Sequence, residues 1–112
     1  MLFSIVCTYK PDADLLRRPY REKHLEYMIA ALPFTLFGGP FLLDNNVRST
    51  GLVVVLDFPD RAAAEAFIAG EPYCRAGLFE SVVVRRWRHM TGEVLAQELK
   101  GERLTGLSLQ GG

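Results

Sequence analysis

The segment at residues 51–58, GLVVVLDF, places the tightest constraint on the fold, because residues 52–56 are apolar at every position. Successive side chains of a β-strand point to opposite faces of the sheet, so a strand of this composition needs cover on both faces. Residues 2–9, LFSIVCTY, also read as a strand that lacks a clearly polar face. We therefore expect a sheet that is covered on both of its faces.

Two segments are expected to form helices. The first runs from about Asp14 to Leu32, with Pro19 in its first turn or at a kink. The second is rich in alanine and has Asp60 as its N-cap and Gly70 as its stop. In the first helix, the i, i+3, i+4, i+7 pattern predicts a stripe that faces the core and consists of Leu25, Met28, Ile29 and Leu32.

Two further strands complete the predicted core. Residues 34–44, FTLFGGPFLLD, are interrupted at 38–40, and a proline that cannot donate to a ladder indicates an edge, a bulge or a strand end. Residues 71–77 form a turn or a single helical turn, and residues 78–87 form the last strand. The order is β-α-β-β-α-β, an α+β, ferredoxin-like arrangement with an antiparallel sheet and both helices on one face. Because the helices cover only that face, we expect a homodimer packed through the sheet face.

Length and charge narrow the class of protein. The 112 residues suffice for one domain with a single core. Thirteen basic and thirteen acidic residues give a formal charge of zero, which provides no long-range attraction for nucleic acid or an anionic membrane. No apolar run approaches the roughly 20 residues that span a bilayer, and no signal peptide is recognised. We expect a soluble cytoplasmic protein that binds neither nucleic acid nor membrane.

The cysteines and the missing motifs limit the chemistry. Cys7 and Cys74 have neither metal-ligand nor redox spacing, and Cys7 lies in an apolar run typical of a buried free thiol. The sequence carries no glycine-rich phosphate loop, no nucleophile elbow and no metal-spaced set of cysteines and histidines. We expect no disulfide, no metal and no cofactor.

His24 lies at the margin of the buried face of the first helix, roughly 90° from the centre of the apolar stripe. Arg21 falls inside the apolar arc, where a guanidinium needs an anion from the protein or from a ligand. Two interpretations stay open. His24 is a boundary residue and Arg21 extends to water, or both line a functional cleft.

Glu71 follows the stop of the second helix and precedes Pro72, so it occupies a defined corner of a loop. It is either a solvated turn carboxylate or the partner of His24. In the second case it would hold one ring nitrogen and leave the other as a base, which suits a side chain that exchanges protons near neutral pH.

Other candidates have weaker signals. Asp44 is a second carboxylate candidate, although its neighbours indicate a turn. Gly39–Pro40 either brings backbone close to a ligand or ends strand pairing. Tyr27 and Tyr73 either line a cleft or pack at the rim of the core, and His89 has no evident partner.

Five segments in this order resemble the YciI-like (YCII-related) proteins over about residues 1–90: MLFSIVCTYK, REKHLEYM, GGPFLLD, GLVVVLDF and EPYCRAGLFESVVVRRW. The resemblance implies a ferredoxin-like fold that assembles into a dimeric α+β barrel. It also implies a cleft that holds a His/Asp pair. His24 matches the histidine, and Glu71 stands where the family usually has aspartate, one methylene shorter.

The resemblance further implies that Arg21 and Gly39–Pro40 shape the cleft. Some relatives look like lyases or dehalogenases of small oxidised ring compounds, and the related muconolactone isomerases transfer protons on the same fold. We expect a small enzyme in which His24 is the base or acid, Glu71 orients it, and Arg21 and Tyr73 bind a small anionic substrate. The alternative is a non-catalytic binding or accessory module that uses the same cleft.

The end of the chain lies outside the resemblance. Residues 1–90 are expected to form the YciI-like domain, and residues 91–112 a C-terminal extension. Within the extension, GEVLAQELK could form two helical turns. The extension is either flexible or in contact with a partner subunit.

Overall fold

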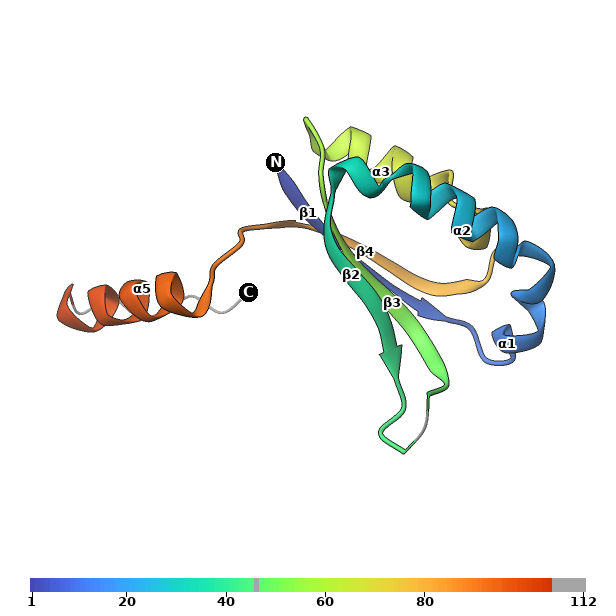
Figure 1. Cartoon of the computed structure of the whole chain (residues 1–112), viewed down its shortest axis with the longest axis horizontal. Coiled ribbons are helices and arrows are strands. Elements are labelled where there is room, and N and C mark those ends of the chain that lie inside the picture. The colour runs from blue at the N-terminus through green and yellow to red at the C-terminus, as the bar shows by residue number, and fades with distance from the viewer. Residues whose placement is uncertain (46, 106–112) are drawn as a thin grey trace.

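The computed structural model describes residues 1–45 and 47–105, apart from the side chains of 104 and 105. A four-stranded antiparallel sheet with the order β2-β3-β1-β4 carries helices on one face (Figure 1). The predicted ferredoxin-like α+β fold is confirmed. The strands are β1 (Leu2–Tyr9), β2 (Thr35–Leu42), β3 (Ser49–Asp57) and β4 (Phe79–Trp87).

The first helical region is divided rather than continuous. A short α1 (Ala13–Leu16) and a 3-10 turn (Arg18–Tyr20) precede α2 (Arg21–Ala30), and a second 3-10 turn (Leu32–Phe34) leads into β2. Pro19 lies in the first 3-10 turn, as its missing amide hydrogen and fixed φ would favour. The predicted break at this proline is confirmed, and the regular helix begins two residues after it.

The second helical region follows the sequence prediction closely. α3 (Arg61–Ala69) begins at the N-cap Asp60, whose side chain accepts a hydrogen bond of 2.8 Å from the amide of Ala63. Gly70 ends the helix, and a single turn, α4 (Pro72–Arg75), follows it. This turn positions Glu71 between the two helices.

The strand register separates two apolar faces. Ile5 of β1 pairs with Val54 of β3 and Val84 of β4 on the face that the helices cover. One residue along, Val6 pairs with Val53 and Val83, and this row of valines points to the opposite face. Among residues 1–45 and 47–105, no helix covers that face (Figure 1). The central strands therefore present apolar side chains on both faces of the sheet, as the sequence predicts.

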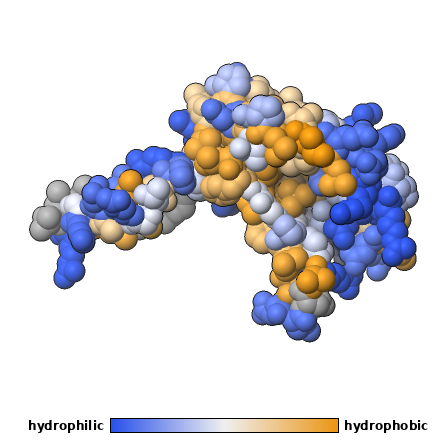
Figure 2. Space-filling view, viewed as in Figure 1, coloured by the Kyte–Doolittle hydropathy of each residue, from blue (hydrophilic) through white to orange (hydrophobic). Residues whose placement is uncertain are grey.

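The core-facing stripe predicted for the first helix is wrong. Leu25, Ile29 and Leu32 are 36%, 62% and 60% exposed, and of the four predicted residues Met28 packs against the core. Two polar anchors fix the rotation of α2 instead. His24 contacts Glu71, and the hydroxyl of Tyr27 donates a 2.7 Å hydrogen bond to the carbonyl of Phe67. Figure 2 shows the resulting apolar surface over α2 and the start of β2.

The C-terminal extension is more helical than expected. α5 (Gly92–Thr105) is a helix of 14 residues that stands away from the sheet and the other helices (Figure 1). An ion pair of 2.7 Å between Arg88 and Glu98 joins it to the end of β4. Residues 106–112 lie outside the described residues, so the prediction for the last part of the extension is untested. Of the helices in residues 1–45 and 47–105, none is long and apolar enough to cross a membrane.

Candidate functional site

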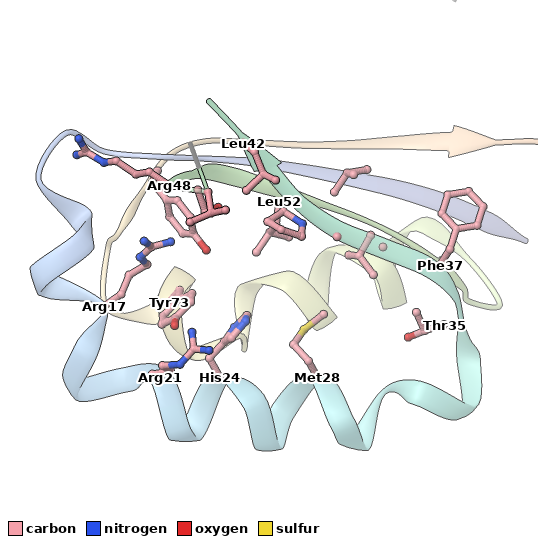
Figure 3. Close-up of a pocket in the computed structure, with 18 of the residues that line it drawn as sticks. Arg17, Arg21, His24, Met28, Thr35, Phe37, Leu42, Arg48, Leu52 and Tyr73 are labelled. Carbon is pink, nitrogen blue, oxygen red and sulfur yellow. The ribbon is translucent and has the colours of Figure 1, made fainter. Parts of the chain in front are cut away.

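A cavity of about 900 Å³ lies between α2 and the strands β2 and β3 (Figure 3). Side chains from one face of α2 form one wall, and β2 and β3 form the other. Arg21, His24, Gly39, Pro40 and Tyr73, all predicted from the sequence to belong to a site, line this cavity.

His24 and Glu71 meet beside the cavity although 47 residues separate them in the sequence. His24 Nδ1 contacts Glu71 Oε1, and the second carboxylate oxygen accepts a 3.0 Å hydrogen bond from the amide of Cys74. Glu71 is 1% exposed, which excludes the interpretation of this residue as a solvated turn carboxylate. Both oxygens of this buried group therefore have a partner, as a buried charge requires.

The environment of His24 favours one tautomer. A backbone amide and the imidazole both face the Glu71 carboxylate, so the proton of the neutral ring belongs on Nδ1. Nε2 is then left as a lone-pair acceptor on a residue that lines the cavity. The ring of Tyr73 stacks under the imidazole at 4.1 Å between centroids and 10° between planes, which limits rotation of His24.

Two tyrosine hydroxyls at the site keep their protons. Burial raises the pKa of Tyr73, while the charges of Arg21 and Arg17 and a hydrogen bond from Arg21 act in the opposite direction. Burial also raises the pKa of Tyr9, against the hydrogen bond and charge of Arg17. Both groups thus stay neutral at physiological pH and can donate hydrogen bonds.

Arginines gather at the end of the cavity next to α1. Asp14 bridges two of them, with Oδ1 at 2.9 Å from Arg17 and Oδ2 at 2.6 Å from Arg48. The guanidinium of Arg17 also lies 4.1 Å above the ring centre of Tyr9. Arg18 and Arg21 add two more cations to the lining, so positive charge exceeds the single carboxylate of Asp14 there.

The glycines of β2 bring backbone close to β3. A Cβ atom added at Gly38 would lie 2.8 Å from the carbonyl oxygen of Val53, so glycine is required there. A Cβ atom at Gly39 would meet nothing within 4 Å. The interpretation that Gly39–Pro40 ends strand pairing is wrong, because β2 stays paired with β3 through Gly39 and Val53 and through Pro40 and Leu52. Gly39 and Pro40 border the cavity.

Several candidates lie away from the cavity. Tyr27 joins α2 to α3 through its bond to Phe67, and Asp44 sits in the exposed turn after β2. His89, for which no partner was expected, stacks on Trp87 with ring centres 5.6 Å apart. The structure therefore brings none of these three side chains to His24.

Sequence reasoning missed Arg17, Arg48 and Tyr9 as lining residues. Arg17 had a detectable signal, because it precedes Arg21 by four residues. Arg48 had none, since only the pairing of β2 with β3 brings it to α1. Among the residues that the structure describes, no group of three or more histidine, cysteine or acidic side chains is placed to hold a metal ion.

Comparisons with known proteins give one strong family match and one informative structure. A model of the YCII-related domain matches residues 1–88. The structure of 5-chloro-2-hydroxyhydroquinone dehydrochlorinase from Burkholderia phenoliruptrix AC1100, in complex with 2,5-dihydroxybenzoquinone, is 26% identical with a TM-score of 0.75. The match covers 80% of this chain and 96% of that chain.

Two other solved structures are more distant. An antibiotic biosynthesis monooxygenase is 22% identical with a TM-score of 0.46, over 80% of this chain and 100% of that chain. A protein from Agrobacterium tumefaciens is 16% identical with a TM-score of 0.48, over 82% and 96%. These similarities are too weak to support a functional argument. No curated protein matches the sequence.

Proposed function

The chain belongs to the YCII-related domain family, and from this premise we propose that it is a small enzyme that performs acid–base chemistry without a cofactor. Its substrate is a small anionic organic compound, and its reaction is an elimination, such as a dehalogenation, or an isomerisation. His24 is the catalytic base, Glu71 positions it, and Arg21 binds the substrate anion.

The observation that carries this proposal is the pair formed by the partly buried His24 and the buried Glu71 at the wall of the cavity. A carboxylate that accepts the Nδ1 proton holds the imidazole in the tautomer whose Nε2 can take a proton. It also stabilises the imidazolium that forms after proton transfer. An ordinary boundary histidine needs neither the buried partner nor the adjacent cavity.

The proposed step is a proton transfer coupled to movement of an electron pair. Nε2 of His24 accepts a proton from a hydroxyl group or an acidic C–H of the substrate. In an elimination, the electron pair forms a new π bond, the bond to the leaving group breaks, and that group departs with its electrons. In an isomerisation, the imidazolium returns the proton to a different atom. Arg21 and the hydroxyl of Tyr73 offer hydrogen bonds to substrate oxygens.

The similarity to the dehydrochlorinase supports this reaction class. That protein has a chlorinated hydroxyhydroquinone as its named substrate and was solved with a dihydroxybenzoquinone. The identity of 26% and the coverage of 96% of its chain make an elimination on a hydroxylated ring the first reaction to test.

Cys7 and Cys74 are free thiols, which supports a reducing, cytoplasmic location.

The experiment is a turnover screen with hydroxylated aromatic compounds, each with and without ring chlorine. Chloride release and the ultraviolet absorbance of quinone products are followed for the wild type, His24→Ala and His89→Ala. We expect turnover of at least one compound by the wild type, a loss of about 10²- to 10⁴-fold in His24→Ala, and no loss in His89→Ala. Binding without turnover of any compound would instead support the non-catalytic binding module.

The functional form is proposed to be a homodimer packed through the sheet face. The row of Val6, Val53 and Val83 gives the open face an apolar centre that needs cover. Val83→Asp places a charge in this row, and Ala62→Asp places one on the exposed side of α3. Sedimentation should show a dimer for the wild type and Ala62→Asp and a monomer for Val83→Asp. A wild-type protein that sediments as a monomer would contradict the proposed dimer.

A further inference from the structure

We propose that the ligand of this cavity has two unlike ends, an acidic group and a hydrocarbon substituent, with the reacting atom between them. This inference rests on the proposed function in placing the reacting atom at His24, and it adds the length and polarity of the substrate. The cavity wall itself carries the argument, because its chemistry changes in order along α2 (Figure 3).

Three residues of α2 mark this order. Arg21, His24 and Met28 all line the cavity, and in Figure 3 they follow one another along the helix. With a rise of about 1.5 Å per residue, Arg21 and His24 are separated by about 4.5 Å along the helix axis, and His24 and Met28 by about 6 Å. A cation, a base and an apolar side chain therefore lie in sequence over about 10 Å.

The cationic end is suited to an acid. Asp14 already pairs with Arg17 and Arg48. Among the residues that the structure describes, no carboxylate forms an ion pair with Arg21, although its side chain lines the cavity. A planar guanidinium recognises a carboxylate or a phenolate through charge-assisted hydrogen bonds. The acidic end of the ligand therefore belongs at Arg21.

The opposite end is suited to hydrocarbon. Beyond Met28, the lining consists of Leu32, Leu36 and Phe37, together with Thr35 at the start of β2. Leu32 and Leu36 are 60% and 44% exposed, so their apolar surface is open to a ligand. Each methylene that a ligand buries against such a surface strengthens binding roughly three- to fourfold.

The volume of the cavity supports a ligand larger than one ring. Cavities of about 300–1,000 Å³ enclose drug-sized ligands, and this one measures about 900 Å³. A single hydroxylated ring held at Arg21 and His24 would leave the wall from Met28 to Phe37 without contact. The geometry therefore favours a ring acid with an alkyl or aryl substituent on the side opposite its acidic group.

The test measures binding rather than turnover and uses the full-length chain with His24→Ala. Isothermal titration follows benzoate, 4-ethylbenzoate and 4-butylbenzoate, with 4-butylbenzamide as the neutral analogue. We expect Kd to fall roughly three- to fourfold per methylene and the amide to bind at least about tenfold more weakly than 4-butylbenzoate. Arg21→Gln should remove the preference for the acid and keep the dependence on chain length.

Two leucine variants identify the hydrocarbon end. Leu36→Ser replaces an exposed leucine of the lining, and Leu25→Ser replaces one of similar exposure on α2 outside the lining. Leu36→Ser should flatten the dependence of Kd on chain length without changing the Kd of benzoate, and Leu25→Ser should change neither. Equal effects of the two variants, or a Kd that does not depend on chain length, would overturn the inference.

The two proposals fail in different ways. If turnover depends on His24 but affinity does not depend on chain length, the acid–base function stands and the two-ended ligand is rejected. If the affinity pattern holds but no compound is turned over, the cavity binds two-ended acids without catalysis.

Discussion

The two long helices that cover the sheet, α2 and α3, differ in what they bury. α3 follows the ordinary pattern, with Ala64 and Ile68 buried and polar side chains outside. α2 exposes Leu25 and Ile29 and turns His24 toward Glu71 and the cavity. The helices have similar lengths and pack on the same face of the sheet, so topology alone does not explain the difference.

The contrast separates the structural helix from the functional one. α2 turns the partly buried His24 toward a buried carboxylate and leaves an isoleucine exposed to water, which makes it a poor element of the core. Proteins keep such local conflicts chiefly at functional sites, where another gain offsets the loss in stability. The helix whose sequence pattern misleads is therefore the helix that carries the proposed chemistry.

The largest expected effect concerns the carboxylate that anchors α2. In Glu71→Gln, the amide of Cys74 still requires an acceptor, so the new carboxamide oxygen faces Cys74 and its NH2 group faces His24 Nδ1. The ring proton then moves to Nε2 and the base is lost. We expect kcat to fall about 10²- to 10⁴-fold.

The matched control for this change is Glu65→Gln on the exposed side of α3, where Glu65 contacts Arg61 at 3.6 Å. Its kcat should equal that of the wild type, because an exposed pair contributes little. Full activity of Glu71→Gln in the same turnover assay would show that Glu71 does not position His24. Its side chain would then serve only as the N-cap of α4, where it accepts a hydrogen bond from the amide of Cys74.

The second effect compares two isoleucines. Ile68 of α3 is 6% exposed and Ile29 of α2 is 62% exposed. Truncation to alanine at Ile68 should lower the free energy of unfolding by about 2–5 kcal/mol, because it leaves a cavity in the core. Ile29→Ala should lower it by less than about 0.5 kcal/mol. Urea denaturation followed by circular dichroism measures both values.

A large loss in Ile29→Ala would mean that α2 is covered by something outside this chain. That cover could be a second copy of the chain or another molecule. Repeating the denaturation over a range of protein concentrations distinguishes them, since only cover from a second copy makes the denaturation midpoint depend on protein concentration.

The third effect concerns the buried thiol of Cys7, which lies in the core that α3 helps to cover. Burial raises the pKa of the Cys7 thiol from 9.0 to about 12, and the charges of Glu71 and Cys74 act in the same direction. A raised pKa in the folded state gives stability that is present below pH 9 and lost as the pH rises toward 12. At pH 10, Cys7 should contribute a loss of about 1.4 kcal/mol relative to neutral pH.

Cys7→Ala isolates this contribution, because the variant lacks the thiol in both the folded and the unfolded state. The difference between its free energies of unfolding at pH 7 and pH 10 should be smaller than in the wild type by that amount. Identical pH dependence in the two proteins would show that the thiol ionises in the folded core.

A structural feature could be predicted from the sequence where it depends on a short local pattern, and not where it depends on contacts between distant residues. The order of strands and helices along the chain, the break at Pro19 and both ends of α3 depend on local patterns and were predicted. The rotation of α2 depends on contacts of His24 and Tyr27 with residues more than 35 positions away, so periodicity pointed to the wrong face. Hydrophobic periodicity assumes that the apolar stripe faces inward, and α2 breaks that assumption.

The same reasoning applies to the site. His24, Arg21 and Glu71 were found because of residue type and family resemblance, and their meeting was one of two open interpretations. The burial of Glu71 could not be predicted, because a glutamate before proline at a helix end is usually solvated. Arg48 reaches the cavity only through the β2–β3 pairing, which a local pattern does not encode.

The smallest effect concerns how the two helices begin. Asp60 caps α3 through its carboxylate, whereas Tyr20 at the start of α2 makes no side-chain cap. Asp60→Ala should lower the free energy of unfolding by about 1 kcal/mol, and Asp60→Asn, which keeps an acceptor oxygen, should restore most of it. Chemical denaturation of the three proteins provides the measurement. Because the carboxylate of Asp60 bonds to the amide of Ala63 and lies at the end of α3 away from Glu71, Asp60→Ala should leave kcat unchanged. A fall in kcat that matches the loss of stability would mean that the two helices act as one unit, and the division into a structural and a functional helix would then be wrong.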